Sequence, residues 1–275
     1  MSQSLVHKLL AQIIVLTLML FCWQLLAIEL ADPLLPSPQS VGLRMVQESQ
    51  SGELWQHLLI TLQRVAVSFL LAFVLGSLLG IILGLFPRCN LWLDPVLVFL
   101  LNIPALVLII LLFVWFGLVE AAAIAAVVIN KIPNVAVTLR EGARAIDQRY
   151  SEMADVFQFS RWLRIRHVLL PQLSPYLLVA ARAGLALIWK IVLVVELLGC
   201  SSGIGFQLHL AFQLFDVTSI LAYSFAFIAV VQALEWFVLQ PLEQWIFRWR
   251  NAEHTGLDAT DSQVERRADA AFTTD

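Results

Sequence analysis

The sequence contains few charged residues. Only 13% of its 275 residues are Asp, Glu, Lys or Arg, whereas 60% are hydrophobic. A soluble globular domain carries about 25% charged residues, so this composition excludes a soluble fold. Two runs contain no charge at all: residues 65–86 (22 residues) and residues 95–119 (25 residues). Because roughly 20 apolar residues cross a bilayer as a helix, the lack of charge predicts a membrane protein.

The sequence also lacks the motifs of common catalytic and cofactor sites. It has no phosphate-binding loop, no dinucleotide fingerprint and no nucleophile elbow. The three cysteines and five histidines are scattered, without metal-ligand spacing. We therefore expect no metal, cofactor, disulfide or nucleic-acid partner, and we expect that the chain is not an enzyme. If it moves a solute uphill, the energy-converting site lies on another subunit.

The apolar stretches predict an all-α membrane protein with six transmembrane helices. Their approximate bounds are residues 9–28, 65–86, 95–119, 121–139, 176–198 and 217–239. The first stretch resembles a secretory signal, but it is long and lacks a small-residue cleavage site, which favours an anchor. The fourth is the weakest, because its second half is interrupted by Asn130, Lys131, Pro133 and Asn134.

The distribution of basic residues predicts the orientation. Residues 140–166 contain six Arg, whereas residues 199–216 contain neither Lys nor Arg. By the positive-inside rule, the Arg-rich connection and both termini are cytoplasmic. Arg44 falls on the opposite side, in the segment 29–64, which is predicted to end in a helix containing Leu54, Leu58 and Leu62. The predicted domains are a transmembrane domain over 1–250 and a polar, disordered cytoplasmic tail over 251–275.

The Arg-rich connection has a pattern that a simple solvated loop does not explain. Apolar residues recur at helical spacing up to Phe157, a polar break follows at 158–160, and apolar residues resume at Trp162. Ser160 suits the N-cap of the second helix. Two short helices with apolar faces can enter a groove on a partner protein. We expect Pro171 and Pro175 to reset the chain before the next span.

The segment Glu152–Pro171 resembles the coupling-helix motif (the EAA loop) of permease subunits of binding-protein-dependent ABC importers. The resemblance covers about residues 62–250 and includes Asn102-Ile103-Pro104, Trp115-Phe116-Gly117 and Ser202-Gly203-Ile204-Gly205. These motifs are most similar to the nitrate, sulfonate and taurine branch. The motif positions of the ATPase-coupling loop are then Glu152, Ala154, Asp155, Gln158, Ser160, Trp162, Arg166, His167 and Pro171.

The resemblance implies a dimer of six-span subunits, identical or similar, in the bacterial inner membrane. Two cytoplasmic ATPase subunits would bind the coupling loops, and an external binding protein would deliver a small, anionic solute. Gln158 departs from the family, which has Gly at this turn because glycine adopts positive φ without strain. Glu152 is expected at the start of the first short helix, where a carboxylate suits the helix dipole.

Four residues are candidates for the translocation pathway: Asn102, Pro104, Lys190 and Glu196. Lys190 is a second departure from the family, and it either attracts an anionic solute or extends its amine toward the membrane surface. Lys190 and Glu196 are six residues apart, which places them on different helix faces. Two other classes remain open: a secondary transporter would show repeated halves and more intramembrane charge, and a membrane-embedded enzyme would need clustered catalytic side chains.

Overall fold

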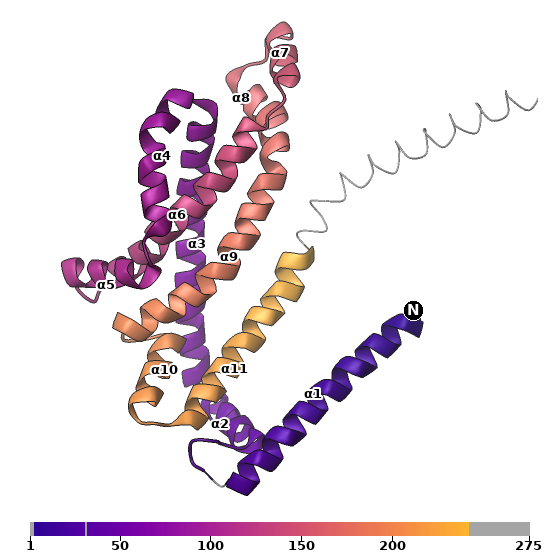
Figure 1. The fold of residues 1–275 in the computed structure, drawn as a ribbon, viewed down its shortest axis with the longest axis vertical. Coiled ribbons are helices and arrows are strands. Elements are labelled where there is room, and N and C mark those ends of the chain that lie inside the picture. The colour runs from indigo at the N-terminus through magenta and orange to yellow at the C-terminus, as the bar shows by residue number, and fades with distance from the viewer. Residues whose placement is uncertain (1–2, 31, 242–275) are drawn as a thin grey trace, which may run out of the picture. The chain divides into compact units, whose positions relative to one another are not determined.

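A computed structural model describes residues 3–30 and 32–241, and within these ranges the protein is helical without a β-strand (Figure 1). The elements are α1 (Gln3–Leu30), α2 (Pro38–Ser51), α3 (Glu53–Leu85), α4 (Pro87–Asn102), α5 (Ala105–Phe116), α6 (Glu120–Arg144), α7 (Gln148–Val156), α8 (Arg161–Arg164), the π-helical turn η1 (Ile165–Leu169), α9 (Leu170–Gly199), α10 (Ile204–Gln213), α11 (Val217–Leu234) and the π-helical turn η2 (Glu235–Leu239). The predicted tail 251–275 lies outside the described residues.

The chain divides into two compact units, residues 1–227 and 228–275. The first unit contains every element from α1 to the first turns of α11, and all the sites described below belong to it. The described part of the second unit consists of the end of α11 and η2.

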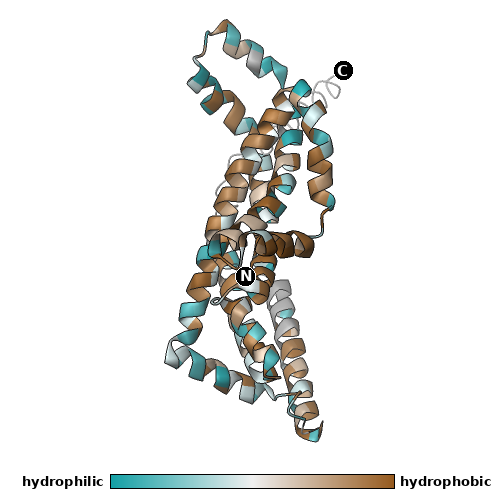
Figure 2. Cartoon of the chain, turned by 90° about the vertical axis from the view of Figure 1, so that its left-hand side faces the viewer, coloured by the Kyte–Doolittle hydropathy of each residue, from teal (hydrophilic) through white to brown (hydrophobic). Residues whose placement is uncertain are grey.

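Four helical stretches are long and apolar enough to cross a membrane: 53–85, 120–144, 161–199 and 217–237. The bent pair α4–α5 is a further candidate, and α1 contains the shorter apolar stretch Ile14–Leu30. Figure 2 shows hydrophobic residues along the long helices, with hydrophilic residues gathered in α7 and α8. The prediction of an all-α protein with several membrane spans is confirmed.

The third predicted span was wrong as a single straight helix. Residues 95–119 fall in α4 and α5, which are bent by 96° relative to each other. The break lies at Pro104, which has no N–H and disfavours helical geometry in the residue before it. Ile103 is accordingly extended, with φ −71° and ψ 124°.

The other prolines were expected to interrupt their spans, but they lie within continuous helices. Pro133 lies inside the unbroken helix α6, and Pro171 and Pro175 lie inside the helical stretch 161–199. The expectation that these two prolines reset the chain is wrong. The helix widens at η1, where the Leu170 N–H bonds to the Ile165 carbonyl, and a π-turn accommodates a missing proline donor better than a regular α-turn does.

Helices α3 and α6 pack closely and run in the same direction. A Cβ atom at Gly80 would lie 2.4 Å from the Ala136 carbonyl oxygen, and one at Gly84 would lie 2.4 Å from Ala143 Cβ. The residue numbers of the contacting positions increase together along both helices, so the two helices are parallel. Glycines at intervals of four let membrane helices approach closely, so the sequence from Gly76 to Gly84 sets this contact.

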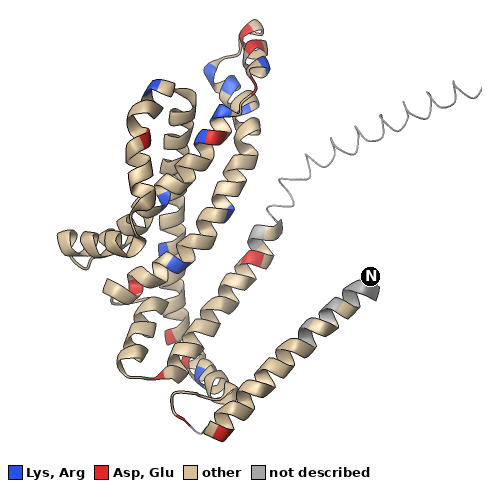
Figure 3. Ribbon diagram, viewed as in Figure 1, with Lys and Arg blue, Asp and Glu red and all other residues tan. Residues whose placement is uncertain are grey.

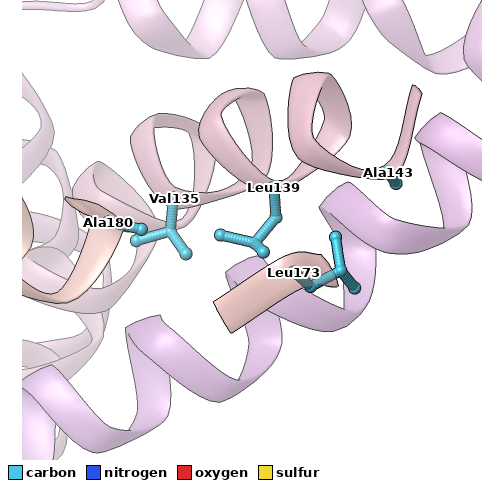
Figure 4. Packing of buried hydrophobic residues seen from close by; sticks show 5 residues of the cluster. All are labelled: Val135, Leu139, Ala143, Leu173 and Ala180. Atoms are coloured by element: carbon cyan, nitrogen blue, oxygen red, sulfur yellow. The ribbon is translucent and has the colours of Figure 1, made fainter. Parts of the chain in front are cut away.

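Helix α9 packs against α6 in the opposite direction. Gly142 of α6 faces Tyr176 of α9, and further along α9 Gly184 faces Val135. Their common core contains five buried residues from the two helices, shown in Figure 4: Val135, Leu139, Ala143, Leu173 and Ala180. This three-helix packing of α3, α6 and α9 holds the connection α7–α8 at one end.

Candidate functional site

The Arg-rich connection forms two short helices, as its pattern predicts. Helix α7 begins after Asp147, whose carboxylate accepts a 2.9 Å hydrogen bond from the Arg149 N–H. The side chain of Gln172 accepts a 3.0 Å hydrogen bond from the Asp147 N–H and thereby joins α7 to the start of α9. Figure 3 shows Lys and Arg residues gathered at this end of the molecule.

The turn between α7 and α8 has the geometry expected of a glycine. Gln158 has φ +50°, in the left-handed region, and the Phe159 N–H bonds to the Ala154 carbonyl at 2.9 Å. Ser160 caps α8 by accepting a 3.3 Å hydrogen bond from the Leu163 N–H, which confirms its predicted role. An ion pair between Asp155 and Arg164 crosses the turn.

Glu152 does not begin the first short helix. Because α7 starts at Gln148 under the Asp147 cap, Glu152 lies in the middle of the helix, where the helix dipole gives it little support. The prediction of a dipole role for Glu152 is therefore wrong, and its side chain is exposed. Ala154, two residues later, is fully buried.

The apolar side chains of this connection are exposed. Val156 is 79% exposed, Phe157 67% and Trp162 68%. Arg166, His167 and Pro171 are also exposed, and His167 Nδ1 lies 3.3 Å from the Leu163 carbonyl oxygen. Large aromatic side chains exposed beside charged ones are typical of a protein interaction surface.

The candidate pathway residues are not brought together. Asn102 and Pro104 are exposed at the break between α4 and α5, and the Asn102 amide donates to the Val98 carbonyl at 2.7 Å. Lys190 is exposed on α9. Glu196 is 0% exposed, so it lies inside the helix packing and does not face an open passage in this structure.

Glu196 belongs to a buried polar cluster centred on Arg64, which we call the Arg64 cluster. The Arg64 guanidinium donates to Glu196 at 2.8 Å and to the two carboxylate oxygens of Glu120 at 2.6 and 2.7 Å. It also donates to the Ser202 carbonyl at 2.6 Å and to the Ser202 hydroxyl at 3.0 Å. These five bonds use every donor of the guanidinium, and Arg64 is only 6% exposed.

The Arg64 cluster also fixes the start of α10. Glu196 accepts hydrogen bonds from the Thr61 hydroxyl and the Gly205 N–H, both at 2.9 Å. His57 Nδ1 accepts a 3.0 Å hydrogen bond from the Gly203 N–H. Gly203 has φ +106°, and a Cβ atom there would lie 2.3 Å from the Glu196 carboxyl carbon. The glycines of Ser202-Gly203-Ile204-Gly205 are therefore required by the close approach of Glu196.

A second polar cluster, which we call the Arg44 cluster, joins α2 to the start of α11. Arg44 donates to the Ser219 hydroxyl at 3.0 Å and pairs with Glu48 at 3.1 Å, and Tyr223 donates to Glu48 at 2.9 Å. Asp216 accepts from the Ser219 N–H at 3.0 Å and from its hydroxyl at 2.6 Å. Burial alone would raise the pKa of Asp216, but the Ser219 hydrogen bonds and the Arg44 charge lower it below its usual value.

Sequence reasoning missed the Arg64 cluster. Arg64 stands next to an uncharged run, where the sequence pattern gives it no role, and Glu196 is predicted only as a pathway residue that lies on a different helix face from Lys190. A usable signal is the single Glu196 near the end of an apolar stretch, because a carboxylate within a membrane span requires a partner.

Comparison with known proteins gives one family. Residues 73–239 match the model of the binding-protein-dependent transport system inner membrane component. An aliphatic sulfonates transport permease protein of Bacillus subtilis is 34% identical over 218 residues, covering 79% of each chain. A taurine transport system permease protein of Escherichia coli is 28% identical over 233 residues, covering 82% of this chain and 84% of the relative.

Two further similarities agree with this family. A nitrate import permease protein of Synechococcus elongatus is 28% identical over 204 residues, covering 70% of this chain and 73% of the relative. Among solved structures, the inward-facing MetNI methionine ABC transporter matches with a TM-score of 0.61 at 18% identity, covering 72% of this chain and 98% of that chain. At that identity the likeness shows the fold alone.

Proposed function

The chain belongs to the family of binding-protein-dependent transport system inner membrane components, and we propose that two copies, or one copy and a similar subunit, form the translocation pathway of an ABC importer. Two cytoplasmic ATPase subunits supply the energy, so no ATP is hydrolysed on this chain. An external binding protein delivers the solute. The observation that carries the proposal is the pair of short helices α7 and α8, with aromatic side chains exposed where an ATPase can bind.

The proposal includes six spans with both termini in the cytoplasm, and α4–α5 counts as one bent span. The asymmetry between the six Arg of residues 140–166 and the absence of Lys and Arg from 199–216 supports this orientation. Ser160→Cys and Ser201→Cys test it, because both residues are exposed on opposite connections. With Cys22, Cys89 and Cys200 replaced, a membrane-impermeant thiol reagent should label position 160 only in inside-out vesicles and position 201 only in right-side-out vesicles.

Coupling is proposed to act through the apolar surface of α7 and α8. Trp is among the residue types whose truncation at the centre of an interface costs about 2 kcal/mol or more, which corresponds to about 30-fold in Kd. Trp162→Ala should therefore weaken binding of the ATPase subunit about 30-fold in detergent solution, with ATP-driven transport reduced accordingly.

Trp55→Ala is the matched control. Trp55 is also exposed (56%), but it lies at the start of α3, at the end of the helix packing away from α7 and α8 (Figure 1). It should bind the ATPase like the parent protein. Equal weakening by both substitutions, or none by Trp162→Ala, would contradict a coupling role for this surface.

The solute is proposed to be a small anion or a zwitterion with an anionic group. The relatives named for sulfonates, taurine and nitrate all move such compounds. The test is ATP-dependent uptake into proteoliposomes containing the permease, its ATPase and its binding protein. Uptake of an aliphatic sulfonate or nitrate is expected, and uptake without ATP would contradict the importer.

A further inference from the structure

The middle of α6 and α9 carries polar and positively charged residues but no acidic ones. Residues 121–140 and 170–195 contain neither Asp nor Glu, and their charged residues are Lys131, Arg140, Arg182 and Lys190. Asn130, Asn134 and Thr138 recur in α6 at intervals of four residues. An interval of four keeps side chains on one helix face, so α6 has a polar stripe within a membrane span.

The polar stripe faces away from α3. Helix α6 contacts α3 through Ala136, Leu139 and Ala143. At 3.6 residues per turn, Asn130 and Asn134 lie roughly on the opposite face. The structure agrees, since Asn134 is exposed and Asn130 is partly exposed. The Asn134 amide donates one hydrogen bond, to the Asn130 carbonyl at 3.2 Å, so its second N–H has no partner among the described residues.

Lys190 lies on the corresponding face of α9. Gly184 faces both Phe69 of α3 and Val135 of α6, with Cβ contacts of 3.9 and 4.0 Å, and Lys190 six residues later is exposed on another side. Asn130 lies five residues before Val135, and Lys190 lies six residues after Gly184. Because α6 and α9 are antiparallel, both residues are displaced from this contact in the same direction, and their depths along the helix axes differ by about 2 Å. Each is roughly 15 Å from the outer end of its helix, which is half the thickness of the hydrocarbon core.

Lys131 adds a second amine at this depth. Its side chain is only 5% exposed, and it has no hydrogen bond or ion pair with any described residue. It precedes Val135 by one helical turn and so lies on the side of α6 that faces the helix packing. Lys131 and Lys190 therefore place two amines at this depth, and neither has an acidic partner among the described residues.

We propose that Asn130, Asn134, Thr138 and Lys190, which we call the α6–α9 polar face, bind the anionic group of the solute during its passage. Lys190 supplies the attracting charge and the two amides donate hydrogen bonds, whereas the Thr138 hydroxyl donates to the Asn134 carbonyl at 3.1 Å and lines the same face. Polar side chains at membrane depth face a bundle interior or a water-filled cavity rather than lipid, so the second copy of the permease forms the opposite wall. This inference rests on the proposed function.

The test uses a cysteine at position 134 in a protein without native cysteines, assembled with its ATPase and binding protein. Asn134→Cys is treated separately with anionic sulfonatoethyl methanethiosulfonate and cationic trimethylammonioethyl methanethiosulfonate. The ratio of the two rates cancels the intrinsic reactivity of the thiol. We expect the anionic reagent to be favoured about ten-fold relative to the ratio measured with Lys190→Met, because a nearby cation attracts it.

Leu78→Cys is the matched control. Leu78 is 55% exposed and lies midway between Gly76 and Gly80, which face Val135 and Ala136, so it has the depth of Asn134 but points away from α6. Neither reagent should modify it from within the lipid.

Two results would overturn the proposal: modification of Asn134→Cys no faster than that of Leu78→Cys, or a rate ratio that Lys190→Met and Lys190→Gln leave unchanged. Failure of the proposed function is distinguishable, since it would be seen as the absence of ATP-dependent uptake by the cysteine-free parent.

Discussion

Removing the Glu196 carboxylate should destabilise the protein far more than removing that of Glu120, although both pair with Arg64. Glu196 is 0% exposed and accepts hydrogen bonds from Arg64, Thr61 and Gly205. Breaking a buried ion pair by removing one partner costs about 3–5 kcal/mol. Glu120 has 55% of its side chain exposed, so water replaces much of its contribution and the loss should be about 1 kcal/mol.

The assay is thermal unfolding of the full-length protein in detergent, followed by tryptophan fluorescence and by the fraction that remains monodisperse. At 2–4 °C per kcal/mol, Glu196→Ala should lower Tm by roughly 10 °C and Glu120→Ala by about 3 °C. Replacing Arg64 and Glu196 together with Leu should cost less than the sum of the two single replacements, because no buried charge is left unpaired. Equal effects of Glu196→Ala and Glu120→Ala would refute the account of the Arg64 cluster.

Three further predictions use the same assay. Because the folded-state pKa of Asp216 is lowered, its contribution to stability is present above the ordinary carboxyl pKa and is lost as pH falls through the folded value; Tm of the parent should therefore fall more between pH 7 and acidic pH than that of Asp216→Asn, and parallel curves would contradict this. Gly80→Ala should lower Tm by several degrees, because its Cβ would lie 2.4 Å from the Ala136 carbonyl oxygen and the backbones must separate; an unchanged Tm would argue against the tight α3–α6 contact. Gln158→Gly should raise Tm by about 1–3 °C and Gln158→Val should lower it, since φ is +50° there, and the opposite order would mean that the turn has another shape.

The membrane spans and the α7–α8 turn could be predicted because each depends on local sequence. An uncharged run of sufficient length is favourable in a bilayer whatever its neighbours are. Ser160 as a cap follows from the polar break between two apolar patterns, whereas the left-handed turn at Gln158 was implied by the resemblance to a family that has Gly there. The position of Glu152 was misjudged because Asp147, five residues earlier, caps the helix instead.

The bend between α4 and α5 could not be read from length and hydropathy alone. The 25 uncharged residues from Pro95 to Val119 satisfy the requirement for one straight span. Pro104 within them permits either a kinked helix or a complete break. The outcome depends on how the two halves pack against α6 and α9, and this is tertiary information.

The Arg64 cluster was beyond prediction for a related reason. Arg64 pairs with residues 56 and 132 positions away in the sequence, and no local pattern joins them. Only the parallel packing of α3 with α6 and the antiparallel return of α9 bring Glu120 and Glu196 to the same guanidinium.

The two clusters also explain the apparent exceptions to the positive-inside rule. Arg44 and Arg64 precede the second predicted span on the side assigned to the exterior, where basic residues are disfavoured. Arg44 pairs with Glu48, and Arg64 pairs with Glu120 and Glu196, so neither presents an uncompensated positive charge. On the other side, Arg166 and His167 remain exposed near the aromatic residues of α7 and α8. Charge that is neutralised within the fold stabilises helix packing at one end, whereas charge left exposed at the other end remains available to a partner. Arg44 and Arg64 are therefore compatible with the proposed orientation, because acidic partners balance their charges on the side where basic residues are disfavoured.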